Sequence, residues 1–550
     1  MLWQRRLWLA GLVLLAVGFS GCDWTMIGFN SSNTYSTPDT SLNSTSVPDL
    51  VLAFTDTTGG SSAGSPIVAN GVLYVDSFST SSSTASLAAF DASGNTNCSG
   101  GTCQPLWTAS LGSTAGSSPA VVNGVVYAGA SNGLDAFDAV GNTNCSGTPK
   151  TCAPLWSASV GPVGSSTSSP VVANGAVYIG STRDNLYAFD AKGVTNCSGT
   201  PTTCSPLWSA NTGGSIEFNL AVADGVTYAA STDDNIYAFD AAGVTNCSGT
   251  PTTCSPLWSA AMPGPIQAAP AVSNGVVYVG TDQGPLSGDN LYAFDANGVT
   301  NCSGTPKTCS PLWLYAVQSQ AIGAPAVADG HVYVSEAFHI MGGALAAFDA
   351  SGNTNCSGTP KVCSPLWTAN GFPAAQSVAN GLVYVAGAVG PAPAKITEYD
   401  DQTGQFVASG QLVGAVGPPV VANGMLYVAT SNGVHAYAPL HTQVLAPSNG
   451  SSVSGTTVLD ASATPGVTVS GVQFVLSGGS LSDQVAGTAT PTIYGWIAVL
   501  PESSEQSGGC GPITLPISVE SEASYSGGVT GTSAPVNISL IVWVPPGECL

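Results

Sequence analysis

The sequence has very few positively charged residues. It carries 8 Lys and Arg against 31 Asp and Glu in 550 residues, which gives a formal net charge of −23. Two of the eight, Arg5 and Arg6, lie at the N-terminus, so the rest of the chain has almost none. A nucleic-acid-binding protein needs a basic surface, so nucleic acid is excluded as a partner. Charged residues make up only 7% of the chain and hydrophobic residues 44%, which excludes long charged helical faces and a charge-driven disordered chain.

The patterns of common enzymes are also missing. The four histidines are His331, His339, His435 and His441, and no two of them have the helical spacing of metal ligands. His339 and Met341 are potential copper ligands, but two ligands do not complete a site. The sequence has no Gly-rich phosphate loop before a helix and no Gly-x-Ser-x-Gly elbow. We therefore predict no catalytic residues and no metal site, and we lean against an enzyme.

Long apolar runs are absent after the first 21 residues. Residues 1–21 join a basic start to a short apolar stretch, and the tetrapeptide FSGC ends at Cys22. This layout is similar to a bacterial lipoprotein signal peptide, which implies an exported protein anchored to a cell-envelope membrane by a lipid on Cys22. A plain cleaved signal is the alternative. Residues 22–48 are rich in Ser, Thr and Asn, which predicts a flexible tether.

A unit of about 50 residues recurs eight times. The first copy, SPIVANGVLYV, starts at Ser65, and the last, PPVVANGMLYV, starts at Pro418. Asn-Gly or Asp-Gly between two β-branched runs predicts a tight β-hairpin, because this turn needs positive φ angles. The turn glycines are Gly71, Gly124, Gly175, Gly225, Gly275, Gly330, Gly381 and Gly424.

Each unit contains four short strands, of the types PAVA, VVYVG, LYAFDA and PLWSA. Four strands per repeat predict an all-β fold, namely an eight-bladed β-propeller over residues 49–440. The last unit lacks its fourth strand, and the isolated strand at 49–57 precedes the first unit. We expect this N-terminal strand to complete the last blade and close the ring.

These repeats resemble the pyrroloquinoline-quinone-type propeller repeat. The seventh unit keeps that family's Thr-Gly turn in YDDQTGQFV, which starts at Tyr399, although Ala408 occupies the position of the docking Trp. The repeat occurs in quinoprotein dehydrogenases and in the lipoprotein subunit of the outer-membrane barrel-assembly machinery. The resemblance therefore implies either a calcium- and pyrroloquinoline-quinone-dependent dehydrogenase or a non-catalytic scaffold. The dehydrogenases use two adjacent cysteines beside the cofactor, and this chain has no such pair, which favours the scaffold.

Six units replace the Thr-Gly turn with a longer loop that holds two cysteines, called here a Cys-pair loop. The pairs are Cys98/Cys103, Cys145/Cys152, Cys197/Cys204, Cys247/Cys254, Cys302/Cys309 and Cys356/Cys363, and Cys510 and Cys549 remain for the C-terminal region. In an exported chain, close local pairs predict disulfides. Zinc, the alternative, needs four ligands, and each loop offers two Cys and no His. A calcium interpretation of the Asp and Asn in these loops is weaker, because their spacing differs from that of calcium loops and they commonly bond their own turn.

Residues 441–550 break the repeat. The stretch from Val444 to Gly479 resembles the start of a bacterial Ig-like domain, and alternation around Val469, Val472 and Phe474 is typical of a half-buried strand. We expect a small β-sandwich that acts as a spacer or adhesion unit.

The strand order places the loops on two rims. The Asn-Gly rim carries the turns between first and second strands and the Cys-pair loops, and it is uniform. The variable rim carries the turns between second and third strands and the connections between units. Function commonly lies on loops that a rigid scaffold presents, so we expect a protein or glycan ligand there, with ordinary solvated loops or a purely structural surface layer as the alternatives. The candidate ligand-binding residues are Arg183, Glu217, Asn219, Asp233, Gln267, Asp282, Glu336 and His339.

Overall fold

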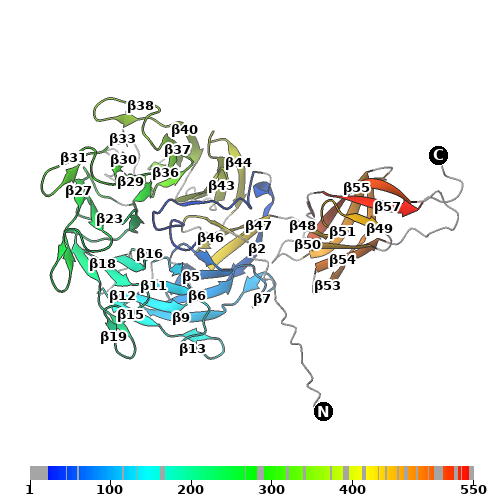
Figure 1. The fold of residues 1–550 in the computed structure, drawn as a ribbon, viewed down its shortest axis with the longest axis horizontal. Coiled ribbons are helices and arrows are strands. Elements are labelled where there is room, and N and C mark those ends of the chain that lie inside the picture. Colours follow the sequence, from blue (N-terminus) through cyan, green and yellow to red (C-terminus); the bar gives the residue numbers. More distant parts are fainter. Residues whose placement is uncertain are drawn as a thin grey trace, which may run out of the picture.

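The chain is all-β. The computed structural model describes residues 23–543 except 45, 58–60, 63, 114–116, 132, 161–167, 267, 282–289, 317–320, 339–341, 372–374, 388–394, 412–416, 432, 440–441, 455–456, 464–468, 479–480, 493–494, 501–511, 526–529 and 534. Within these residues the helical structure is one 3-10 turn, η1 (Val47–Asp49). No helix in the described part of the chain is long and apolar enough to cross a membrane. Figure 1 shows repeated sheets grouped around a common centre, which is the arrangement of a propeller, and a separate group of C-terminal strands.

Eight sheets, numbered 1 to 8 here, follow one plan in the described residues. The first strands contact one another from each sheet to the next and so surround the centre. They are β4 (Ile67–Ala69), β10 (Ala120–Val122), β16 (Val171–Ala173), β22 (Ala221–Ala223), β28 (Ala271–Ser273), β35 (Ala326–Ala328), β41 (Ala375–Ala379) and β45 (Val420–Ala422). The second strands are β5 (Val72–Ser79), β11 (Val125–Ala130), β17 (Ala176–Gly180), β23 (Val226–Ser231), β29 (Val276–Gly280), β36 (His331–Phe338), β42 (Leu382–Gly387) and β46 (Met425–Thr430).

The predicted hairpin turns join these strands. In sheet 3, for example, Asn174 has a φ of 51° and Gly175 a φ of 80°, so both central residues take the positive φ that a type I′ turn requires. The third strands are β6 (Thr84–Asp91), β12 (Gly133–Asp138), β18 (Asn185–Asp190), β24 (Asn235–Asp240), β30 (Asn290–Asp295), β37 (Gly342–Asp349), β43 (Lys395–Asp400) and β47 (Gly433–Pro439). The fourth strands are β9 (Trp107–Gly112), β15 (Trp156–Ser159), β21 (Trp208–Asn211), β27 (Trp258–Ala261), β33 (Trp313–Ala316), β40 (Trp367–Gly371), β44 (Phe406–Gln411) and, in sheet 8, β2 (Leu50–Asp56).

The N-terminal strand completes the last sheet, as the sequence predicted. β2 is antiparallel to β47, with Leu50 opposite Pro439 and Thr55 opposite His435. The two strands come from opposite ends of the repeats, so this pairing fastens the N-terminal side of the repeats to their C-terminal side.

Each Cys-pair loop forms a small hairpin that reaches back to the preceding sheet. In the loop of sheet 3, β20 runs parallel to β15 of sheet 2, with Ala158 opposite Cys204. The hairpins are β7 (Cys98–Ser99) with β8 (Thr102–Cys103), β13 (Cys145–Ser146) with β14 (Thr151–Cys152), β19 (Cys197–Ser198) with β20 (Thr203–Cys204), β25 (Cys247–Ser248) with β26 (Thr253–Cys254), β31 (Cys302–Ser303) with β32 (Thr308–Cys309), and β38 (Cys356–Ser357) with β39 (Val362–Cys363). They lie at the outer margin in Figure 1, where they cover edge strands that would otherwise be free to pair with other chains.

All six predicted loop disulfides are present. Cys510 and Cys549 lie outside the described residues, so their predicted pairing remains a prediction. The long loops therefore have a structural purpose that the sequence did not reveal, because each closed loop joins two neighbouring sheets.

In sheets 1 to 5, a buried Trp in the fourth strand contacts the next Cys-pair loop. A Cβ at Gly193 would lie 2.2 Å from Cδ1 of Trp156, so only glycine fits at this point, where φ is 66°. One sheet further on, the indole nitrogen of Trp208 and the hydroxyl of Tyr178 both donate to the carbonyl of Ala241, each at 3.0 Å. These contacts fix the angle between neighbouring sheets.

The C-terminal strands form two sheets with one shared hydrophobic core, which includes Leu459 and Ala461 from one sheet and Phe474 and Val519 from the other. Val51 of β2 packs against this core, so the last repeat sheet and the C-terminal region are in contact. One sheet contains β48 (Thr442–Ala446), β50 (Thr457–Ala463), β53 (Thr490–Thr492) and β54 (Gly495–Leu500). The other contains β49 (Ser452–Ser454), β51 (Val469–Gly478), β52 (Leu481–Thr488), β55 (Pro512–Tyr525), β56 (Thr530–Thr532) and β57 (Val536–Trp543).

Candidate functional site

The centre of the repeat sheets is occupied by the chain itself. Residues 23–37, called here the N-terminal segment, run along the first strands of the sheets. At its start, Trp24 and Val68 of β4 exchange two backbone hydrogen bonds of 2.7 and 2.9 Å. At its end, β1 (Ser36–Thr37) pairs in parallel with β41. The segment was expected to be a flexible tether, and over its described residues it is a bound part of the fold.

Backbone hydrogen bonds fasten the segment to successive sheets. Each donor is a backbone amide of a first strand that points away from its own hairpin and needs a partner. The bonds run from Val121 N to Thr25 O (2.7 Å), Val222 N to Ser31 O (2.5 Å), Val272 N to Ser32 O (2.8 Å), Val327 N to Thr34 O (2.7 Å) and Val378 N to Tyr35 O (2.8 Å). The segment thus satisfies the inner amides of several sheets at once.

Two side chains of the segment anchor it further. Asn33 is fully buried, and its amide donates to the carbonyls of Leu220 at 2.7 Å and Pro270 at 3.2 Å. The hydroxyl of Tyr35 lies in hydrogen-bond contact with Asn219, and burial raises the pKa of Tyr35 to about 12. The many Ser, Thr and Asn residues suggested a flexible segment. Composition does not show that the backbone carbonyls of these residues accept hydrogen bonds from buried amides.

Asn219 is half-buried and bonds to a neighbouring sheet. Its Oδ1 accepts a 2.8 Å hydrogen bond from the backbone N of Ser169. The same bond links the earlier sheets, from Ser118 N to Ser169 Oγ and from Ser65 N to Ser118 Oγ, each at 2.8 Å. Asn219 therefore replaces a serine in a belt of hydrogen bonds between neighbouring sheets, and its ligand role remains a prediction.

Glu336 is in the interior. It lies on β36 with 3% of its surface exposed. Burial raises the pKa of its carboxyl to about 7, and a hydrogen bond with Tyr315 opposes the rise. The sequence analysis expected Glu336 in an exposed loop. β36 is longer than most second strands, so the strand continues through Glu336.

Arg183, Glu217 and Asp233, called here the variable-rim cluster, lie on three neighbouring loops of sheets 3 and 4. Arg183 follows β17, Asp233 follows β23, and Glu217 lies in the connection from β21 to β22. The hydroxyl of Tyr237 donates to Asp233 at 2.6 Å, so that carboxylate is already engaged in its own turn.

Backbone hydrogen bonds lock these loops together. Ile216 N donates to Ser181 O at 3.1 Å, and Thr232 N donates to Ser215 O at 2.9 Å. The connection that carries Glu217 is thus held between the two turns that carry Arg183 and Asp233. Gln267, Asp282 and His339, the other predicted ligand residues, lie outside the described residues.

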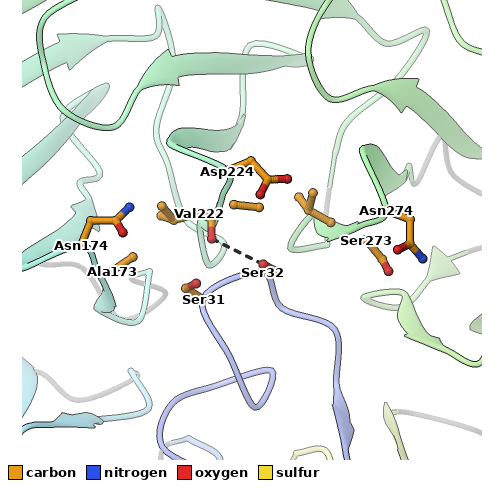
Figure 2. Close-up of a pocket in the computed structure, with 10 residues that line it drawn as sticks. Ser31, Ser32, Ala173, Asn174, Val222, Asp224, Ser273 and Asn274 are labelled. Carbon is orange, nitrogen blue, oxygen red and sulfur yellow. Dashed lines mark hydrogen bonds between the residues drawn. The ribbon is translucent and has the colours of Figure 1, made fainter.

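A small polar hollow of about 240 Å³ lies on the Asn-Gly rim between sheets 3, 4 and 5. Figure 2 shows the turns that carry Asn174, Asp224 and Asn274 around it, with Ser32 of the N-terminal segment donating to the carbonyl of Val222 at 3.5 Å. Asp224 is the one ionisable side chain in its lining. The lining therefore offers one carboxylate, with no second ionisable side chain beside it.

The described residues do not fit a quinone and calcium site. No group of three His, Cys, Asp or Glu side chains in the described part of the chain is arranged to hold a metal ion. The loop aspartates serve their own turns, since Asp190 accepts from the backbone N of Lys192, Val194 and Thr195 at 3.1, 3.1 and 2.6 Å. Burial alone would raise the pKa of Asp190, but these hydrogen bonds outweigh it and lower the pKa. The centre of the sheets, in turn, is filled by the N-terminal segment.

The chain matches the family model described as "Outer membrane protein assembly factor BamB" over residues 51–243 and 198–301. Over these repeats it is similar to the pyrroloquinoline-quinone-type repeat family.

Solved structures with a similar fold include BamB from Moraxella catarrhalis, with 14% identity, 71% of this chain and 97% of that chain covered and a TM-score of 0.44. Another is the quinohemoprotein alcohol dehydrogenase from Comamonas testosteroni, with 15% identity, 78% and 83% covered and a TM-score of 0.48. The computationally designed Ika8 protein gives 14% identity, 70% and 99% covered and a TM-score of 0.47. No curated protein matches the chain.

Proposed function

We propose that the protein is a non-catalytic lipoprotein of the bacterial cell envelope, anchored through Cys22 on the periplasmic or surface face of a membrane. In this proposal the eight sheets are the blades of one closed propeller, the C-terminal sheets form an Ig-like sandwich, and the assembly is a rigid scaffold for an envelope protein. A glycan is the second class of ligand that a rim of this kind would accept.

The observation that carries the proposal is the N-terminal segment in the centre of the sheets. Its backbone uses the inner amides of the first strands, and Asn33 and Tyr35 are buried against the sheets. Recognition is then left to the outer surfaces. The match to a family described by an outer-membrane assembly factor supports a protein partner over a small-molecule substrate.

The alternative is a calcium- and pyrroloquinoline-quinone-dependent dehydrogenase. The donor set argues against it, because the described residues offer no cluster of metal ligands. A calorimetric titration of the full chain with pyrroloquinoline quinone, with and without calcium, tests this directly. We expect no saturable heat, and saturable calcium-dependent binding at micromolar or tighter affinity would overturn the scaffold proposal.

The variable-rim cluster is the proposed partner-binding surface. Its three loops are locked by backbone hydrogen bonds and are therefore preorganised, which lowers the entropy cost of binding. A photo-crosslinking amino acid in place of Arg183 should give a discrete protein adduct in intact cells. The matched control carries the same amino acid in place of Val194, on the opposite rim, and should give no protein adduct. Equal adducts from both positions, or none from Arg183, would contradict this assignment.

A further inference from the structure

We propose that the Asn-Gly rim lies directly against the phosphate headgroups of a membrane, so that the variable rim points away from it. The inference rests on the proposed lipidation of Cys22 and goes beyond it, because a lipid anchor alone does not fix which face of a protein meets the bilayer.

The first argument is the position of the residue next to the anchor. The carboxylate of Asp23 accepts a 3.0 Å hydrogen bond from the backbone N of Asn70, in the turn between β4 and β5. Trp24 follows at once, 1% exposed and bonded in both directions to Val68. One residue spans at most about 3.6 Å, so a lipid on Cys22 would enter the bilayer next to this turn without a spacer.

The second argument is a row of exposed apolar side chains on the same rim. Val194, Val244 and Val299 occupy the same position in three consecutive Cys-pair loops and are 71%, 75% and 72% exposed. Val140, in the preceding loop, is 67% exposed. Apolar side chains that are exposed at the same position of neighbouring loops favour an interaction surface over a solvated loop.

Backbone bonds place these valines at the rim itself. Val194 N donates to Asp190 at the end of β18, and Ala191 N donates to the carbonyl of Gly175 in the Asn-Gly turn of the same sheet, both at 3.1 Å. The valines and the turn beside Asp23 therefore belong to one rim.

The third argument is charge. Six basic residues follow the first 21 residues, and four of them are Lys150, Lys192, Lys307 and Lys361, all in Cys-pair loops. The loop aspartates beside them are engaged by backbone N–H groups, as Asp190 is. These four lysines can contact lipid phosphate groups, while the loop aspartates keep their charge and bind backbone N–H groups of their own turns.

The lysines also provide the test. The full-length protein is purified in detergent and reconstituted into vesicles of phosphatidylethanolamine and phosphatidylglycerol. Both samples are labelled briefly with a membrane-impermeant amine-reactive reagent, and each site is measured by mass spectrometry. Lys192 and Lys307 are exposed on the Asn-Gly rim, and Lys395 is exposed at the start of β43, on the variable rim, where it serves as the internal control.

We expect labelling of Lys192 and Lys307 to fall at least about fivefold on vesicles while Lys395 changes by less than about twofold, since a surface pressed against headgroups excludes the reagent. Equal labelling of all three lysines in both samples would overturn the orientation and leave the lipoprotein standing. If the intact mass shows no acyl group on Cys22, the lipoprotein proposal itself fails and the orientation falls with it.

A variant separates the rim from the anchor. Replacing Val194, Val244 and Val299 together with serine keeps the anchor and removes the apolar row, so labelling of Lys192 and Lys307 on vesicles should rise at least about twofold. The control is V458S, because Val458 is 50% exposed on β50 of the C-terminal region. Protection unchanged in the triple variant would contradict a role for the valines.

Discussion

Removing the side chain of Asn33 should release the N-terminal segment. Asn33 has a φ of 53°, which glycine tolerates, so Asn33→Gly deletes the side chain without forcing the backbone. Two buried hydrogen bonds disappear, to the carbonyls of Leu220 and Pro270. At about 1 kcal/mol each, the loss is about 2 kcal/mol, which corresponds to about a 30-fold increase in local opening.

Hydrogen exchange measured by mass spectrometry reports this opening on peptides that cover residues 23–37. The matched control is Asn123→Gly, because Asn123 is exposed in a hairpin turn and has a similar φ of 52°. We expect exchange to accelerate about 30-fold in Asn33→Gly and to remain unchanged in the control. The reasoning is refuted if the two variants exchange alike.

Three further predictions concern the loops and the core. Replacing Cys197 and Cys204 together with serine opens an eight-residue loop and should cost about 2.5 kcal/mol in the chain-entropy model, measured by urea unfolding; a loss below about 0.5 kcal/mol would show that the hairpin holds without its disulfide. Gly193→Ala should lower the melting temperature more than an alanine at an exposed turn glycine such as Gly175, because its Cβ would lie 2.2 Å from the ring of Trp156. Burial raises the pKa of Glu398 from 4.5 to about 8, so the folded state holds a proton that the unfolded state releases. The stability of the fold should therefore decrease as the pH rises from about 4.5 to about 8. Glu398→Gln should reduce this decrease in a pH series of melting curves, and an unchanged slope would rule out Glu398 as its cause.

The repeat architecture could be predicted because its signals are local and recur. Asn-Gly turns, alternating strands and a Trp at a fixed offset are each visible within a few residues, and eight copies remove the ambiguity of one. Pairing of Cys within each loop also follows from proximity. The closing strand was predictable for a different reason. The last repeat lacks its fourth strand, and the strand at the N-terminus belongs to no repeat, so the two were expected to pair.

The N-terminal segment could not be recognised from composition. Its hydrogen bonds join residues far apart in sequence, such as Ser31 with Val222, and backbone amides leave no trace in the side-chain pattern. One signal was available, namely the apolar residues Trp24, Met26 and Tyr35 within a polar stretch, all of which are buried. A free tether has little reason to carry them.

Two structural properties decide where the predicted ligand residues lie, namely the length of the strand beside each residue and its place in the belt of hydrogen bonds between sheets. Arg183, Glu217 and Asp233 follow strands of ordinary length and lie on the variable rim. Glu336 is interior because β36 is long, and Asn219 takes the belt position that serines hold in earlier sheets, where their hydroxyls accept the same bond. Neither property can be read from one position alone.

The most direct test of the account is residue-resolved hydrogen exchange on the intact protein, read by electron-transfer fragmentation. The amides to follow belong to Val121, Val222, Val272, Val327 and Val378, which point from the innermost strands towards the centre. If the N-terminal segment fills the centre, these amides exchange as slowly as those in the middle of the sheets, because each donates to a segment carbonyl. If they exchange rapidly, as amides on an open inner edge do, the centre is free for a ligand and the scaffold proposal loses its main support.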